Sequence, residues 1–272
     1  MPIQSEHLGD GICLVKISNP GKRNALDMEM FQSLARLWPE LNMDPQVRCV
    51  VVTGGGSKAF CSGADLSAHM DRSLGMDDLI DAALLKTSLF DKPMIAAIEG
   101  ACVAGGLELA LAADIRIAAF DAVLGLPEVR WGIVPSGGGA MKLCDQIGHA
   151  RAMDLLMTGR LITGREAQDI GLVTQACEPG STIDLAMARA RLIAANSPSA
   201  LFATKHIALS RRASTYAAME ARERFMVAQV RDAGDPEEGK AAFLEKRVPV
   251  FGPVPDGLRR LASGPRTTNK GK

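Results

Sequence analysis

Aromatic side chains are scarce in this sequence, and neither sign of charge predominates. Only 4% of the 272 residues are aromatic, so a core must be built from aliphatic side chains. The 31 basic residues are balanced by 31 acidic ones. A neutral balance provides no field that attracts a polyanion, and few aromatic rings are present for base stacking. Neither nucleic acid nor a membrane surface is therefore an expected partner.

Cysteine and histidine are few and scattered. The six cysteines form no C-x-x-C pair and stand mostly in apolar runs, which indicates reduced core thiols and a reducing compartment. The four histidines have no metal-ligand spacing, so no metal site is expected. No apolar run approaches the roughly 20 residues that span a bilayer. Residues 1–10 are polar and show no signal-peptide pattern, so the predicted location is the cytoplasm.

Strand and helix patterns alternate through the first two thirds of the chain, which is typical of an α/β fold. Residues 27–42 have apolar side chains at helical spacing, with Asp27 as the expected N-cap and Pro39 expected to kink or end the last turn. Further helices are expected over 67–86, 140–147, 150–157 and 163–171. Strands are expected over 12–17, 47–53, 93–98 and 115–119, and from 173 onward.

Beyond residue 184 nearly every pattern is helical, with helices expected over 184–195, 199–211, 213–231 and 236–247. This shift predicts a catalytic core over residues 1–195 and a C-terminal helical region over residues 196–262. Residues 263–272 carry almost no apolar side chain and are expected to be disordered.

Residues 99–118 combine an apolar helix pattern with one acid, Glu108, shortly after Gly105 and Gly106. A buried glutamate is costly without a partner, and glycines at a helix start leave backbone N–H groups available. Amide donors beside a buried acid are components of acyl chemistry. The alternative is an acid that only complements the helix dipole.

Two other motifs point elsewhere but are incomplete. Gly54-x-Gly56-x-x-Ala59 has the spacing of a dinucleotide fingerprint, yet no helical pattern follows it. Ser62 and Ser136 do not lie in the G-x-S-x-G sequence of a serine hydrolase, and no histidine is near either one. A turn that ends a strand accounts better for the glycine motif.

Three loops of small residues, at 59–65, 104–106 and 135–139, accompany two acids, Glu108 and Glu128. Small residues allow a backbone to approach a ligand closely, and two carboxyls at one reacting centre can divide acid and base roles. Glu128 by itself slightly favours the alternative of an exposed loop acid.

The order and spacing of these motifs resemble the enoyl-CoA hydratase/isomerase (crotonase) superfamily over roughly residues 10–252. The matching segments are NAL at 24–26, AFCSGADL at 59–66, GGLEL at 105–109 with ADIRIA at 113–118, PEV at 127–129 with GIVP at 132–135, and FLEKR at 243–247. The resemblance implies an α/β, crotonase-like superhelix of repeated ββα units, followed by a C-terminal helical oligomerisation region that forms a homotrimer or a dimer of trimers.

The resemblance also implies the parts of an active site for an acyl-CoA thioester. The amides of Ala64 and Gly105 would form an oxyanion hole for the thioester oxygen. Glu108 would activate a water for attack at C3, and Glu128 would exchange the proton at C2. No cofactor is implied, because coenzyme A is part of the substrate.

Substrate-binding residues follow from the same resemblance. Ala64, Gly105 and the segment Asp65, Leu66 and Ser67 would line the CoA path, Lys22 or Arg23 would meet a CoA phosphate, and Phe243 and Lys246 would lie near the nucleotide end. Surface charges unconnected with CoA are the alternative for the cations. Two departures from the family pattern are Ala104, where many members have glycine, and Trp131, which is expected to shape the acyl pocket.

The paired acids favour a (2E)-enoyl-CoA hydratase, giving a 3-hydroxyacyl-CoA in fatty acid or related acyl-CoA degradation. The scaffold hosts several acyl-CoA reactions, so double-bond isomerisation remains an alternative. A third possibility, a non-catalytic acyl-CoA- or RNA-binding relative, is disfavoured because both acids are retained, the charges balance and aromatic residues are scarce.

Overall fold

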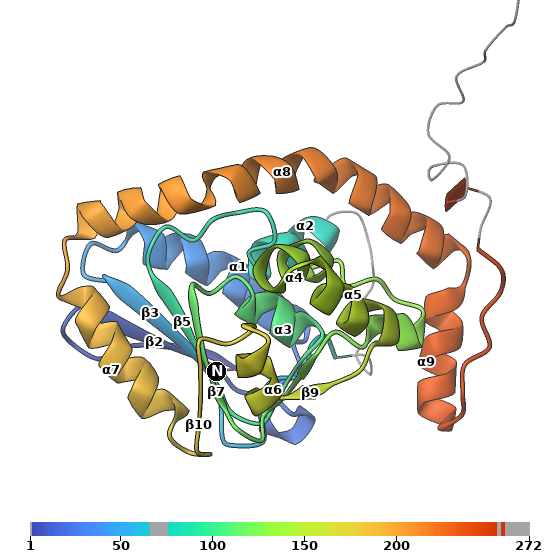
Figure 1. The fold of residues 1–272 in the computed structure, drawn as a ribbon, viewed down its shortest axis with the longest axis horizontal. Coiled ribbons are helices and arrows are strands. Elements are labelled where there is room, and N and C mark those ends of the chain that lie inside the picture. Colours follow the sequence, from blue (N-terminus) through green and yellow to red (C-terminus); the bar gives the residue numbers. More distant parts are fainter. Residues whose placement is uncertain (1, 66–75, 255–256, 259–272) are drawn as a thin grey trace, which may run out of the picture.

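A computed structural model describes residues 2–65, 76–254 and 257–258. Two sheets lie at its centre with helices around them (Figure 1). The larger sheet has the strand order β1-β2-β3-β5-β7-β10, and all its pairs are parallel except β1 with β2. Its strands are β1 (Ile3–His7), β2 (Ile12–Ile17), β3 (Cys49–Gly54), β5 (Met94–Ile98), β7 (Ile115–Ala119) and β10 (Gln175–Cys177). The smaller sheet orders β4 (Ala59–Cys61), β6 (Ala101–Val103), β8 (Val123–Gly125) and β9 (Ile162–Thr163).

A strand–strand–helix unit repeats along the chain, as the predicted superhelix requires. In each unit the first strand joins the larger sheet and the second joins the smaller one. The units are β3-β4-α2, β5-β6-α3 and β7-β8 followed by η2 and α4, where α2 is Met76–Ala83, α3 is Gly105–Ala110, η2 is Glu128–Trp131 and α4 is Gly139–Ile147. Because β4, β6 and β8 are parallel neighbours, the loops after them emerge at one edge. Gly54 and Gly56 lead into β4 rather than a helix, so the dinucleotide alternative is wrong.

Helices cover both faces of the larger sheet. In β3 the side chains of Val50 and Val52 pack in a cluster with α1 (Met28–Met43), whereas Cys49 and Val51 pack in a second cluster with α7 (Thr182–Ala194). Side chains of a strand alternate between its faces, so a strand apolar throughout is buried on both. The parallel sheet is therefore a rigid interior layer from which the loops project.

The α1 helix begins as predicted and ends within one residue of the predicted end. The Asp27 carboxylate accepts a hydrogen bond from the Met30 amide at 2.9 Å, which is N-terminal capping. Pro39 lies inside the helix, which continues to Met43, so Pro39 does not end it. The last turn retains its position because Trp38 and Leu41 are buried in the core.

The C-terminal part contains a single long helix where two were expected. α8 runs without interruption from Pro198 to Asp232, so the predicted division between 211 and 213 is wrong. No glycine or proline stands between Ser199 and Ala233, and the chain therefore has no breaker there. α8 spans one side of the molecule, and α9 (Asp235–Glu245) runs from its end along the adjacent side (Figure 1).

Short strands were the main omission of the sequence-based expectations. β1, β4, β6, β8 and β9 are two to five residues long and were not predicted, because such runs show no clear alternation. The expected loop at 59–65 therefore begins with a strand. The remaining elements are η1 (Pro20–Lys22), α5 (His149–Thr158) and α6 (Gly164–Asp169). The first part of the helix expected over 67–86 and the tail expected over 263–272 lie outside the described residues. Within the described ranges, no helix combines the length and apolarity needed to cross a bilayer.

Candidate active site

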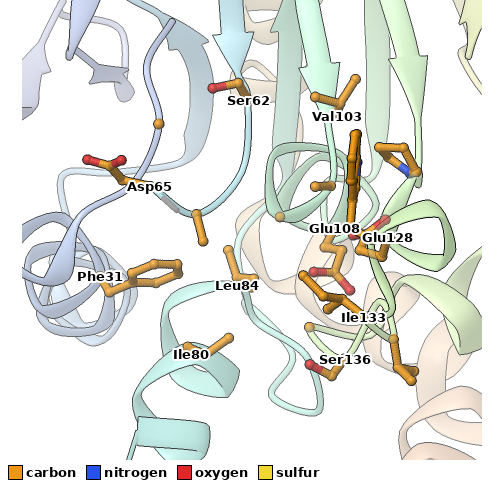
Figure 2. A pocket seen from close by; sticks show the side chains of 18 of the residues that line it. Phe31, Ser62, Asp65, Ile80, Leu84, Val103, Glu108, Glu128, Ile133 and Ser136 are labelled. Carbon is orange, nitrogen blue, oxygen red and sulfur yellow. The ribbon is translucent and has the colours of Figure 1, made fainter. Parts of the chain in front are cut away.

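A cavity of about 510 Å³ opens at the edge where the loops after β4, β6 and β8 meet. It is lined by nine of the residues predicted for the site: Lys22, Arg23, Ala64, Asp65, Gly105, Glu108, Glu128, Trp131 and Phe243. Lys246 does not line it and is exposed at the C-terminal end of α9. Leu66 and Ser67 lie outside the described residues. Figure 2 shows Glu108 and Glu128 next to each other, across the cavity from Phe31 and Asp65.

The loop after β4 is held so that the Ala64 amide is not used by its own backbone. Leu26 and Ala64 form an isolated parallel bridge in which the Leu26 amide donates to the Gly63 carbonyl and the Asp65 amide donates to the Leu26 carbonyl, each at 2.8 Å. Along a paired strand, successive residues point their amides alternately toward the partner strand and away from it. The Asp65 amide points toward Leu26. The Ala64 amide therefore faces away from Leu26, and Ala64 lines the cavity.

The loop after β6 brings a second amide beside the first. Ala104 has φ 51° and ψ −131°, a backbone conformation that strongly favours glycine, and its amide donates to the Gly125 carbonyl at 3.0 Å. A Cβ built on Gly105 would lie 3.8 Å from the Ala64 nitrogen. Between described residues, no hydrogen bond uses the amide of Ala64 or of Gly105. Two backbone donors are therefore available on adjacent loops of the cavity.

Glu108 is buried in the first turn of α3, with 5% of its surface exposed. Its Oε1 accepts a hydrogen bond from the Gly139 amide at 2.9 Å. A Cβ on Gly137 would lie 2.6 Å from Oε2, and one on Gly139 would lie 3.0 Å from Oε1. Glycine at these two positions is therefore what allows the loop before α4 to enclose the carboxylate. Burial raises the pKa of Glu108 to about 7.

Glu128 begins η2 and is 8% exposed, so the alternative that it is an exposed loop acid is wrong. Among the described residues its Oε2 has no hydrogen-bond partner. Burial, and then the neighbouring Glu108, raise the pKa of Glu128 well above its ordinary value. Two adjacent buried carboxyls do not readily both ionise, so the pair retains a proton at neutral pH and can act as one acid and one base.

The cations at the cavity are placed differently from one another. The Lys22 ammonium lies 2.6 Å from the Asp65 carboxylate, so this lysine is engaged in an ion pair at the cavity wall. Arg23 is exposed and has a positive φ of 52°. Its side chain lines the cavity. The expectation that one of them meets a CoA phosphate stays a prediction.

An aromatic pair forms another wall of the cavity. The rings of Trp131 in η2 and Phe243 in α9 meet edge to face, with centroids 5.1 Å apart. α9 approaches η2 so closely that a Cβ on Gly239 would collide with the Trp131 carbonyl oxygen, and glycine at this position permits the approach. Sequence reasoning missed several lining residues because their apolar patterns indicate only a core; they are Phe31, Ile80, Leu84, Ile133 and Val134. It expected the loop at 135–139 to approach a ligand, but it did not predict the contact of Gly137 with Glu108.

A ββα superhelix whose cavity joins a buried carboxyl pair to two available backbone amides defines a class of protein that handles acyl groups. Within the described residues, no cluster of three or more His, Cys, Asp or Glu could hold a metal ion. The family model described as enoyl-CoA hydratase/isomerase matches residues 7–253. The chain therefore belongs to the enoyl-CoA hydratase/isomerase family, and the predicted resemblance, fold class and enzyme class are confirmed.

Individual relatives agree with this assignment. The enoyl-CoA hydratase EchA19 of Mycobacterium tuberculosis is 37% identical, over 88% of this chain and 92% of its own. The (E)-benzylidenesuccinyl-CoA hydratase of Thauera aromatica is 35% identical, over 92% and 99%. Among solved structures, a carnitinyl-CoA hydratase from Mycobacterium avium has a TM-score of 0.84 and 32% identity, covering 92% of this chain and 98% of that one. These names share a hydration reaction on a CoA ester and differ in the acyl group.

Proposed function

We propose that this protein is an enoyl-CoA hydratase, which adds water reversibly to a (2E)-enoyl-CoA to give a 3-hydroxyacyl-CoA. The observation that carries the proposal is the pair of buried carboxyls, Glu108 and Glu128, in one cavity with the unused amides of Ala64 and Gly105. Hydration needs a base for water, an acid for C2 and a stabiliser for the thioester oxygen. The four groups match these three needs.

The roles of the two acids follow from their surroundings. Glu108 is the base: the Gly139 amide holds one of its oxygens, and a pKa of about 7 leaves a usable fraction as carboxylate at neutral pH. It takes a proton from water as the water oxygen bonds to C3. The raised pKa of Glu128 keeps this acid protonated, and it delivers its proton to C2. The amides of Ala64 and Gly105 bind the oxygen that gains charge, and each such donor is typically worth about 3 kcal/mol.

The substrate is proposed to lie with its acyl group among the apolar lining residues and its CoA toward Arg23 and Lys22. Trp131 and Phe243 narrow the cavity and are proposed to limit the acyl group. Leu66, Ser67 and Lys246 stay predicted CoA contacts. The reaction is proposed to need no cofactor beyond the CoA of the substrate. Fatty acid or related acyl-CoA degradation in the cytoplasm is the proposed setting.

Double-bond isomerisation is the second candidate, because the matched family description covers both reactions. An isomerase moves a proton between C2 and C4 and adds no water. Incubation with a 2-enoyl-CoA and with a 3-enoyl-CoA separates the two, because only a hydratase yields a 3-hydroxyacyl product directly from the former.

Hydration of crotonyl-CoA by the Glu108→Gln and Glu128→Gln variants tests the proposal. Either change should lower kcat at least about 100-fold, since each removes a proton-transfer group, while calorimetry should still detect 3-hydroxybutyryl-CoA binding. Glu40→Gln, at an exposed position on α1, is the matched control and should leave kcat unchanged. Hydration at the wild-type rate by either site variant would overturn the assignment.

A homotrimer or a dimer of trimers is proposed as the assembly. Its support is a set of apolar side chains on α8 that stay at least 45% exposed in the described chain: Phe202, Ile207, Met219 and Phe225.

A further inference from the structure

Lys142 is a buried lysine whose position is costly. It lies in the first turn of α4, is 5% exposed, and donates a hydrogen bond to the Leu85 carbonyl at 2.7 Å. Helical side chains lean toward the N-terminus, where the helix dipole disfavours a cation. Burial lowers the pKa of Lys142 to about 8. A single neutral carbonyl does not balance a buried ammonium, so a carboxylate is expected nearby.

The ammonium stem and the Glu108 carboxylate lie on opposite sides of one loop. A Cβ on Gly138 would lie 3.2 Å from the Lys142 Cε. Cβ atoms on the flanking Gly137 and Gly139 would instead meet the two Glu108 oxygens, at 2.6 and 3.0 Å. The loop therefore touches the lysine with its middle glycine and the catalytic carboxylate with its outer two. The lysine stem and the carboxylate are therefore both packed against the same three glycines.

The other nearby carboxylates already have a cation. Asp81 and Glu223 lie 3.5 and 3.2 Å from the Lys86 ammonium. Asp81 also accepts from the Arg224 guanidinium at 2.8 Å. These groups come from α2, α8 and the loop after α2.

Four charged groups therefore act on Lys142, and they are not equally available to balance its charge. Glu108 and Asp81 favour its ammonium form, and Lys86 and Arg116 oppose it. Since Asp81 is engaged by Lys86 and Arg224, Glu108 is the carboxylate left to balance Lys142. Glu223 acts on Glu108 in the opposite sense, as a second negative charge.

We propose that Lys142 is the buried counter-charge of Glu108: across the glycine loop it favours the carboxylate form of that glutamate and leaves the proton of the acid pair on Glu128. Lys142 is a positioning residue, because its ammonium is behind the loop and it does not line the cavity. This inference rests on the acid and base roles proposed above. It explains why a lysine occupies the disfavoured end of α4.

Titration of the Glu108 carboxyl tests the inference without substrate. In protein labelled with carboxyl-¹³C glutamate, the Glu108 signal is assigned by its loss in Glu108→Gln. In Lys142→Met the midpoint should rise by at least about one pH unit, a tenfold change in the ionisation constant. In Lys142→Arg, which retains the charge, it should stay close to the wild-type value. An unchanged midpoint in Lys142→Met would overturn the inference.

Two further measurements guard against a misfolded variant. Lys205→Met also removes a largely buried lysine, but its partner is Asp114, so it should leave the Glu108 midpoint unchanged. Coupling is reciprocal, so Glu108→Gln should lower the midpoint of Lys142, observed through its ¹³Cε signal. This second titration needs no change at Lys142. If Lys142→Met does not fold, an unmoved Lys142 midpoint in Glu108→Gln overturns the inference alone.

Kinetics separate this inference from the proposed function. For crotonyl-CoA hydration, Lys142→Met should move the acid limb of the kcat–pH profile upward by about one unit, with kcat restored at high pH and KM little changed. Carboxyl midpoints that shift in a protein without hydratase activity would retain the charge coupling and remove the function. Hydratase activity with an unshifted acid limb and unshifted carboxyl midpoints would retain the proposed function and overturn the charge coupling.

Discussion

At Ala104 the backbone adopts a conformation that glycine tolerates far better than alanine, φ 51° with ψ −131°. The cost of such a conformation is of order 1–3 kcal/mol. It occurs where the chain turns from β6 into α3, and the turn directs the Gly105 amide to the cavity. The strain is therefore located next to the donor that the proposed reaction uses.

Replacing Ala104 by glycine should raise the free energy of unfolding by about 1 kcal/mol, because relief of strain outweighs the added entropy of the unfolded chain. Urea denaturation measures this change. Ala188→Gly, on the exposed side of α7, is the control and should lose about 1 kcal/mol. Equal losses for both variants would show that Ala104 is not strained.

The buried acids also make stability depend on pH. A carboxyl whose pKa is raised by folding contributes stability that is present at pH values below its unfolded pKa and is lost as pH rises through the folded pKa. For Glu108 this loss occurs between its ordinary pKa and about 7, and for Glu128 it likewise occurs above the ordinary pKa of a glutamate.

Glu128→Gln should therefore stabilise the fold above neutral pH while removing activity. The gain over wild type should increase from pH 5 to pH 9 and reach about 2 kcal/mol, because an amide has no charge to bury. Urea unfolding at several pH values measures it. The exposed Glu40→Gln should show no such trend, and a Glu128→Gln gain independent of pH would contradict the raised pKa.

At the scale of elements, α9 and η2 form one unit at the cavity wall. Gly239 of α9 lies against the Trp131 backbone, and Gly132 lies against the Asp235 backbone. Two glycines therefore permit the close approach that places Phe243 on Trp131. α9 therefore contributes Phe243 to a cavity whose other lining residues lie between Lys22 and Gly137.

A methyl group at Gly239 should separate the two elements. Gly239→Ala is expected to lower stability by about 1–3 kcal/mol, since it overpacks a close contact. It should also raise KM for crotonyl-CoA more than it lowers kcat, because the aromatic wall moves and the acid pair does not. Gly252→Ala, where a Cβ meets nothing within 4 Å, is the matched control. Wild-type KM and stability in Gly239→Ala would show that α9 docks without this contact.

At the scale of the whole molecule, α8 is only partly covered. Ile207 on this helix is 75% exposed, and Phe202, one turn and a half earlier, is 49% exposed. Exposed apolar side chains on a long helix at the surface are typical of a region that pairs with another chain. The proposed trimer would cover it.

Sedimentation equilibrium should give three or six times the mass of one chain. Ile207→Glu should shift the distribution toward smaller species, because a charge would then be buried at the interface. Met43→Glu changes a side chain that is 82% exposed on α1 and should leave the assembly intact. A stable wild-type monomer would refute the proposed assembly, and so would a loss of mass in both variants.

Much of the fold is local and was predictable. The cap at Asp27, the two-faced apolar strand β3 and the capped α6 follow from short-range spacing, which one stretch of chain carries by itself. The short strands β6 and β8 are stabilised by neighbours distant in sequence, so local patterns do not reveal them.

The sequence by itself determined the α/β class, the family and the acids on which the site depends, because these are carried by residue types in a fixed order. Tertiary structure alone decided that Glu128 is buried beside Glu108, that Gly137 and Gly139 enclose the carboxylate, and that Lys142 lies behind them. The physical reason is that proton affinity depends on desolvation and on nearby charges. Both are set by which distant segments meet in space, and spacing along the chain does not record that.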